Sequence, residues 1–116
     1  MSEYDRFDNF GSVNLDSGLR LMESIIGGRW NPMILFAIEQ GATRYSDIRA
    51  SVSDISDTEL QRKLGALTLS RLVSKNNPAE DARRSEYLLT DFGGEITHTL
   101  RHILAISRKH GEMETS

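Results

Sequence analysis

The apolar residues of this chain recur at the spacing of helices over most of its length. The first stripe includes Leu19, Met22 and Ile25 and ends at paired glycines, which predicts a helix that begins near Asp16. The segment PMILFAIEQ, residues 32–40, is apolar nearly all round, so we expect the second helix to run through the core.

Capping residues indicate where the next helices begin and end. Asn31 is a favourable N-cap for the second helix, Pro32 suits its first position, and Gly41 should follow its end. A short third helix should follow Ser46, with Ile48 on its inner face.

The segment ISDTELQRKLGALTLSRLV, residues 55–73, combines a buried stripe with a hydrogen-bonding face. Ser56 followed by Glu59 matches a capping box, which fixes the start of a helix of about 14 residues, 57–70. A short helix, a tight turn and this capped amphipathic helix are typical of a helix-turn-helix. The apolar stripe consists of Leu60, Leu64 and Leu67, and the polar face of Thr58, Gln61 and Arg62.

Two short segments of alternating polarity, 72–77 and 85–90, predict strands that flank an exposed connection led by proline, 78–84. Thr90 can cap a final helix that ends near Gly111. This order of elements describes a winged helix-turn-helix, which is a mainly α fold with a small β-hairpin as its wing.

The final helix carries an apolar stripe about four turns long, more than one small domain is able to cover. Pairing of the first and last helices with a second copy would bury it. We expect one winged-helix domain at 15–111, a flexible N-terminal arm at 1–14 and a flexible tail at 112–116. The dimer interface should include Leu19, Met22, Ile96, Leu100, Ile103 and Leu104.

Composition limits the classes of protein that this chain can belong to. No apolar run reaches the roughly 18 residues that cross a bilayer, and the N-terminus lacks a signal-peptide pattern, so we expect a cytoplasmic protein without membrane contact. The net charge of −3 counts against nucleic-acid binding. Residues 60–84, however, hold six basic and two acidic residues, and local charge is what a phosphate backbone senses.

Several kinds of chemistry find no support in the sequence. Cysteine is absent, which excludes disulfides, thiolate metal sites and thiol catalysis. There is no phosphate-binding glycine loop, nucleophile elbow or HExxH motif, so we expect neither an enzyme nor a cofactor. Glu95, His98 and His102 share one helix face and could hold zinc, but we favour exposure or dimer packing and predict no metal. At a dimer seam, the histidines would make assembly sensitive to pH.

Taken in order, these segments resemble the HxlR-type winged-helix regulators, relatives of the MarR group. The resemblance implies a homodimeric repressor or activator that binds DNA, with dimer contacts from the first and last helices. The segments that carry it are IIGGRW (25–30), MILFAI (33–38), GATRYSDI (41–48), ISDTELQRKLGAL (55–67) and RSEYLLTDFGGEI (84–96).

The chain departs from the family pattern in ways that bear on function. Many members carry a cysteine before the first helix that senses oxidants or electrophiles, and this chain has none. Tyr45 replaces a phenylalanine, and Asp57 and Thr58 stand where the family often has proline and arginine. Arg71 replaces a glycine, and the wing carries the acidic pair 80–81.

Residue chemistry suggests how the polar face would read DNA, although a merely solvated face is the alternative. Glutamine suits adenine, arginine suits guanine, and threonine suits a thymine methyl group. Asp57 could accept from cytosine, or simply stabilise the helix N-terminus. Basic residues beside the third helix and in the wing suit phosphate or the minor groove. The predicted DNA contacts are Arg44, Ser56, Asp57, Thr58, Gln61, Arg62, Arg83 and Arg84.

The sequence therefore predicts a transcription regulator that binds double-stranded DNA as a homodimer on an inverted-repeat operator. Residues 57–69 would enter the major groove, and the wing, 77–84, would contact flanking backbone or the minor groove. The alternative is a winged-helix module that binds protein and has weak or no DNA affinity, which the acidic net charge favours. Trp30 and Tyr45 could line an effector pocket, although a core position suits Trp30 better; a small-molecule effector is left open.

Overall fold

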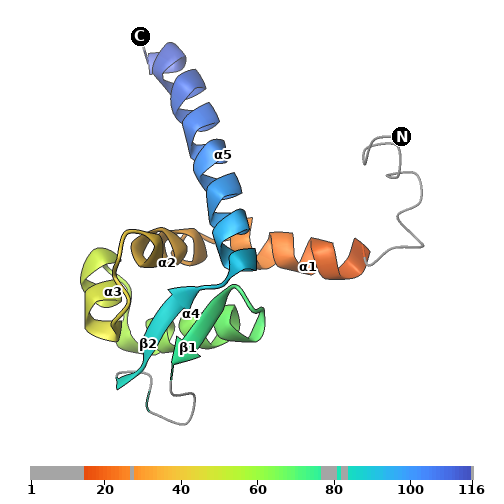
Figure 1. Ribbon diagram of the computed structural model, residues 1–116. Coiled ribbons are helices and arrows are strands. Elements are labelled where there is room, and N and C mark those ends of the chain that lie inside the picture. The colour runs from red at the N-terminus through yellow and green to blue at the C-terminus, as the bar shows by residue number, and fades with distance from the viewer. Residues whose placement is uncertain (1–14, 27, 77–80, 82–83, 116) are drawn as a thin grey trace.

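The computed structural model describes residues 15–26, 28–76, 81 and 84–115 of the chain. These residues form five helices and a two-stranded antiparallel sheet, the order predicted for a winged helix-turn-helix (Figure 1). The elements are α1 (Leu15–Ile26), α2 (Trp30–Glu39), α3 (Tyr45–Ser51), α4 (Asp57–Leu69), β1 (Val73–Asn76), β2 (Glu86–Leu89) and α5 (Asp91–Thr115).

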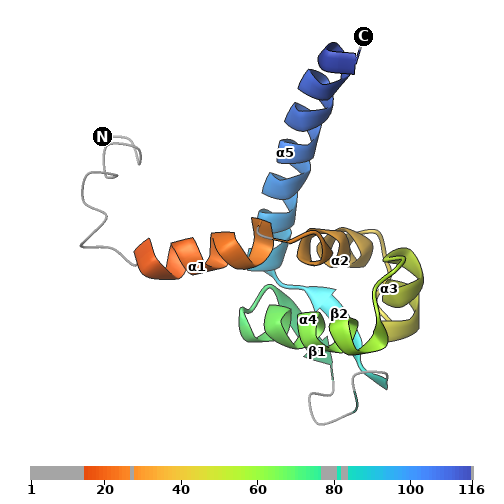
Figure 2. The ribbon, with the colours of Figure 1, turned by 180° about the vertical axis from the view of Figure 1, so that it is seen from behind.

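The helices α2, α3 and α4 form a body with the hairpin, and the two terminal helices project from it. Figures 1 and 2 show α5 standing out from this body and α1 extending from it in a different direction. Both views place α4 and the hairpin at the end of the molecule opposite the end of α5. Among the described residues, none of the helices combines the length and apolar character that crossing a membrane requires.

The core lies among α2, α3, α4 and the hairpin, as the apolar patterns predicted. The stripe of α4 is fully buried, with Leu60, Leu64 and Leu67 at most 2% exposed. The predicted central position of α2 is confirmed, because four of its apolar side chains are buried. The core residues with the lowest exposure also include Ile34, Leu35, Ile48, Val52, Leu72, Val73 and Tyr87.

The hairpin and the start of α5 are joined by a compact set of bonds at Thr90. Val73 of β1 pairs with Leu89 of β2, so the strand ends lie beside the helix start. The Thr90 hydroxyl donates to the Arg71 carbonyl at 2.6 Å and accepts from the Gly93 amide at 2.9 Å. The second bond confirms Thr90 as the cap of the last helix.

The start of the second helix and the end of the last helix differ from the sequence prediction. Asn31 does not cap α2: the helix begins at Trp30, and the buried Asn31 amide instead donates to the Ser24 carbonyl, which ties α2 to α1. A tertiary hydrogen bond thus takes the side chain that the local pattern assigned to a cap. The predicted end of the last helix near Gly111 is also wrong, because α5 continues to Thr115. One glycine costs a helix only about 1 kcal/mol, and the residues around it favour helix.

Adjacent glycines at the start of α5 allow a direct test of this packing. A Cβ atom on Gly93 would lie 1.9 Å from the Leu72 carbonyl oxygen, whereas a Cβ on Gly94 would have nothing within 4 Å. We expect Gly93→Ala to lower the free energy of unfolding by about 2 kcal/mol or more, because backbone must move. Gly94→Ala should be neutral or stabilising by up to about 1 kcal/mol. Urea denaturation of both variants measures the difference, and equal stabilities would contradict the packing described.

Candidate nucleic-acid interface

The start of α4 is fixed by a side-chain cap. Ser56 lies in extended backbone and its hydroxyl accepts from the Glu59 amide at 3.0 Å, which confirms the predicted N-cap. The buried leucine stripe then sets the rotation of the helix about its axis. As a result, Thr58, Gln61 and Arg62 are all exposed on the outer side of α4.

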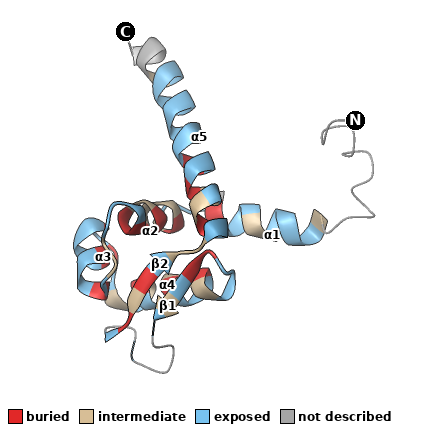
Figure 3. Ribbon diagram, in the orientation of Figure 1, coloured by how far each residue is buried: buried red, intermediate tan, exposed pale blue. Residues whose placement is uncertain are grey.

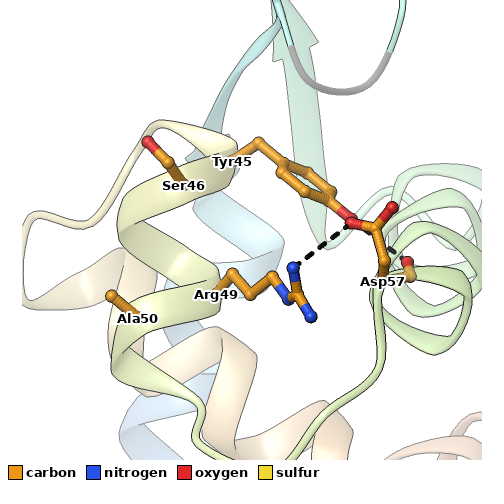
Figure 4. A pocket seen from close by; sticks show the side chains of 5 residues that line it. All are labelled: Tyr45, Ser46, Arg49, Ala50 and Asp57. Carbon is orange, nitrogen blue, oxygen red and sulfur yellow. Dashed lines mark hydrogen bonds and ion pairs between the residues drawn. The ribbon is translucent and has the colours of Figure 1, made fainter.

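The junction between α3 and α4 centres on the Asp57 carboxylate, as Figure 4 shows. The Tyr45 hydroxyl donates both to this carboxylate and, at 3.1 Å, to the Asp57 carbonyl. An Arg49 nitrogen lies 3.9 Å from the same carboxylate, and the Gln61 amide nitrogen donates to it at 3.2 Å. Two helices therefore share one acidic group, which has internal partners on both of them.

An open depression of about 400 Å³ lies beside this junction, lined by Tyr45, Ser46, Arg49, Ala50 and Asp57. Tyr45 is only 5% exposed, so it belongs to the core, and it also lines the depression. Trp30, the other aromatic candidate, is half-buried against the core, and the Arg29 guanidinium lies 5.0 Å from its ring centre. The depression beside Tyr45 is open to solvent, and Trp30 is not part of its lining.

Arg62 is the most accessible cation on the polar face of α4. Its guanidinium lies 3.8 Å from the Glu59 carboxylate, and its side chain is 70% exposed. An exposed ion pair of this kind contributes about 0–1 kcal/mol to the stability of the fold. Arg62 therefore loses little free energy when it leaves Glu59 for another acceptor.

The wing and the approach to α3 supply two further exposed arginines. Arg44 lies in extended backbone before α3 and forms an isolated bridge with Glu86 of β2. The helix α3 begins at Tyr45, two residues earlier than predicted. Arg84 is exposed just before β2, and its amide donates to the Asp81 carbonyl at 2.9 Å. Arg83 and most of the predicted wing, 77–84, lie outside the described residues.

Tyr87 of β2 is buried, and its backbone amide donates to the Thr43 carbonyl, two residues before α3, at 2.8 Å. Burial raises the pKa of the Tyr87 phenol above its usual value, and the charges of Tyr45 and Asp81 raise it further. The phenol is therefore neutral at physiological pH and adds no charge under the interface.

Exposed apolar side chains gather on α1 and α5, where a dimer interface was predicted. Leu19, Met22, Ile103 and Leu104 are between 45% and 54% exposed. Figure 3 shows that, among the residues of α5 that it colours by burial, the buried ones lie in the first turns. Ile106, which is 48% exposed, belongs to the same surface, and its spacing from Ile103 was a signal that the sequence prediction did not use.

Two of the predicted interface residues are already buried or half-buried within their own protomer. Leu100 is 8% exposed and belongs to the core, and Ile96 is half-buried against it. They line a small apolar pocket of about 80 Å³ between α1 and α5, together with Met22, Ile25 and Ile103. Leu100 therefore lies below the exposed surface, because α1 and α2 reach the first turns of α5.

Glu95, His98 and His102 are all exposed on α5. Within the described part of the chain, no three or more His, Cys, Asp or Glu side chains are grouped so that they could hold a metal ion. One helix face spreads these three side chains along its axis, which keeps them from converging on one ion.

Comparison with known proteins connects this geometry to a family. The sequence model of the HxlR-like helix-turn-helix family matches residues 25–115. An uncharacterized HTH-type transcriptional regulator of Methanothermobacter thermautotrophicus is 26% identical over 104 residues, which cover 90% of this chain and 79% of that protein. The uncharacterized HTH-type regulator YvaP of Bacillus subtilis is 33% identical over 79 residues, which cover 68% of this chain and 73% of YvaP.

The fold is also shared with a solved structure. A crystal structure of a MarR-family transcriptional regulator from Enterococcus faecalis V583 has a TM-score of 0.70 to this chain at 21% identity. The similarity covers 86% of this chain and 91% of that chain. At this identity the comparison supports the winged-helix fold and nothing finer.

The cap at the start of α4 generates a stability prediction. We expect Ser56→Ala to lower the free energy of unfolding by about 1 kcal/mol, because the Glu59 amide loses its acceptor. Ser53→Ala, an exposed serine in the preceding turn, is the matched control and should change stability by less than about 0.5 kcal/mol. Thermal and urea unfolding measure both variants; a Ser56→Ala protein as stable as the control would show that the cap contributes nothing.

Proposed function

The chain belongs to the HxlR-like helix-turn-helix family, whose members are transcriptional regulators and not enzymes, and we propose that it binds operator DNA as a homodimer. One observation carries this proposal. A capped helix, anchored by three buried leucines, keeps Thr58, Gln61 and Arg62 exposed beside the helix α3 that precedes it. This is the arrangement in which a recognition helix enters the major groove while the preceding helix crosses the backbone.

Each exposed side chain then has a defined task. On binding, the Arg62 guanidinium leaves the Glu59 carboxylate and contacts guanine or phosphate. Gln61 and Thr58 contact base edges. Arg44 and Arg84 approach the flanking phosphates, with the wing on the backbone or in the minor groove. Asp57 contacts no base in this proposal, because its carboxylate already accepts from Tyr45 and Gln61.

Pairing of two protomers follows from the apolar surface of α1 and α5. Exposed leucine, methionine and isoleucine side chains on both helices are more favourably buried against a second copy than left in water. A two-fold dimer presents two recognition helices, so the operator should be an inverted repeat with half-site centres about one helical turn apart, roughly 34 Å. Because its partner is chromosomal DNA, the protein would act in the cytoplasm.

Two observations favour a second candidate, a winged-helix module that binds protein. The acidic Asp57 stands at the N-terminus of α4, and the net charge of the chain is −3. A salt titration with random duplex DNA separates the two functions. A DNA-binding protein loses affinity steeply as salt rises, since it displaces counterions, whereas a protein-binding module shows almost no dependence.

The first prediction from this proposal concerns the exposed arginines. We expect Arg62→Ala/Arg84→Ala to weaken binding to a selected operator by at least about tenfold and to reduce the salt slope by about 1 to 2, one for each lost phosphate contact. Arg108→Ala/Lys109→Ala, which also removes two positive charges, but from the exposed far part of α5, is the control and should bind as the parent does. Fluorescence anisotropy at several salt concentrations gives both quantities. Unchanged affinity in the double variant would refute the docking proposed here.

The second prediction concerns assembly. We expect the parent protein to sediment as a dimer, and Met22→Glu/Leu104→Glu to raise its dissociation constant about a hundredfold or more, because buried carboxylates would lack partners. Leu88→Glu, at a comparably exposed position (48%) on β2, should leave the dimer intact. Analytical ultracentrifugation measures all three, and circular dichroism checks the fold. A parent protein that is monomeric at every concentration would overturn the dimer.

A further inference from the structure

Tyr45 of α3 and Asp57 of α4 are in direct contact across the junction of the two helices (Figure 4). The Tyr45 hydroxyl donates to the Asp57 carboxylate. A phenylalanine at position 45 could not donate this bond, and a residue without a side-chain acceptor at position 57 could not accept it. Tyr45 and Asp57 therefore form one unit.

The unit extends to the exposed face of α4 through Gln61. The Gln61 amide nitrogen donates to the second oxygen of the Asp57 carboxylate at 3.2 Å. A carboxylate is only an acceptor at neutral pH, so the amide group of Gln61 must turn its nitrogen, and not its oxygen, toward Asp57. Asp57 therefore fixes which way the Gln61 amide points.

This orientation determines what Gln61 offers to a base. An amide nitrogen carries two hydrogens, and Asp57 accepts one of them. The other hydrogen and the carbonyl oxygen remain, and together they form the edge that pairs with N7 and N6 of adenine. A glutamine without Asp57 would sample other rotamers and both amide orientations, and would lose that freedom on binding.

The charge of Asp57 is balanced where it lies. The Arg49 guanidinium is 3.9 Å away, and the carboxylate stands in the first turn of α4, where the helix dipole favours an anion. The Asp57 side chain is 29% exposed, so much of it is shielded from solvent. These neighbours limit its repulsion of DNA phosphates.

We propose that Tyr45 and Asp57 are positioning residues that hold Gln61 for adenine and thereby set one base preference of α4. The inference rests on the proposed DNA-binding function. Tyr45 acts through Asp57, and Asp57 acts through Gln61, which alone touches the base.

The experiment is selection of bound sequences from random duplex DNA by the full-length protein and a set of variants. The parent should enrich adenine at one position of each half-site, and Gln61→Ala should lose that preference. Asp57→Ala, which leaves Gln61 in place, should reduce the adenine preference about fivefold there and leave the other positions unchanged. Tyr45→Phe should produce a smaller reduction at the same position, because the carboxylate then loses its hydroxyl donor.

Two further variants separate positioning from charge and from general stability. Asp57→Asn keeps an acceptor for Gln61 without the charge, so it should restore most of the adenine preference that Asp57→Ala loses. Asp47→Ala removes an exposed carboxylate from α3 and should change no base preference. Thermal unfolding verifies that each variant is folded at the temperature of selection.

The outcomes that overturn the inference are distinct from failure of the proposed function. An adenine preference that survives Asp57→Ala would overturn it, as would a preference of Gln61 for another base. A cytosine preference lost in Asp57→Ala would overturn it too, since Asp57 would then read a base directly. Enrichment of no sequence by the parent would instead refute the proposed function, and the positioning role with it.

Discussion

Burial of the leucine stripe of α4 is the constraint on which the rest of the structure depends. Leu60, Leu64 and Leu67 leave almost no surface to solvent, so the helix cannot rotate about its axis without exposing them. This fixed rotation keeps the polar side chains of α4 on the outer side. The Ser56 cap fixes the start of the helix in the same way, because an uncapped first turn would fray.

Electrostatics explains how an acidic chain can carry the DNA-binding surface proposed on α4. Asp57, an acidic residue beside the polar face of α4, has partners on α3 and α4 and is not simply directed at solvent. The exposed cations Arg44, Arg62 and Arg84 are held by weak contacts or lie open on the surface, where phosphate can reach them. The overall charge is thus a poor guide to the field at this one surface.

The described protomer leaves an apolar surface on its two terminal helices. Only the first turns of α5 pack into the body, where Leu100 is buried, and farther along Ile103, Leu104 and Ile106 are exposed. Arg101 reaches Glu39 and lies 5.6 Å from the centre of the Phe36 ring, which anchors α5 to α2 close to where its apolar surface begins. A helix anchored at its base and apolar beyond it is suited to pairing, which is the basis of the proposed dimer.

The sequence alone determined the order of the elements, the buried stripes, the caps at Ser56 and Thr90 and the exposure of Gln61 and Arg62, because all of these follow from local spacing. It did not determine the role of Asn31, the burial of Leu100 or the contact of Tyr45 with Asp57. Each of these depends on which elements pack together, and Tyr45 and Asp57 belong to different helices. Helical periodicity reports only neighbours within about four residues, whereas a hydrogen bond between helices exists only once both are packed in place. Tertiary structure therefore decided which polar groups are partners and which remain available to a ligand.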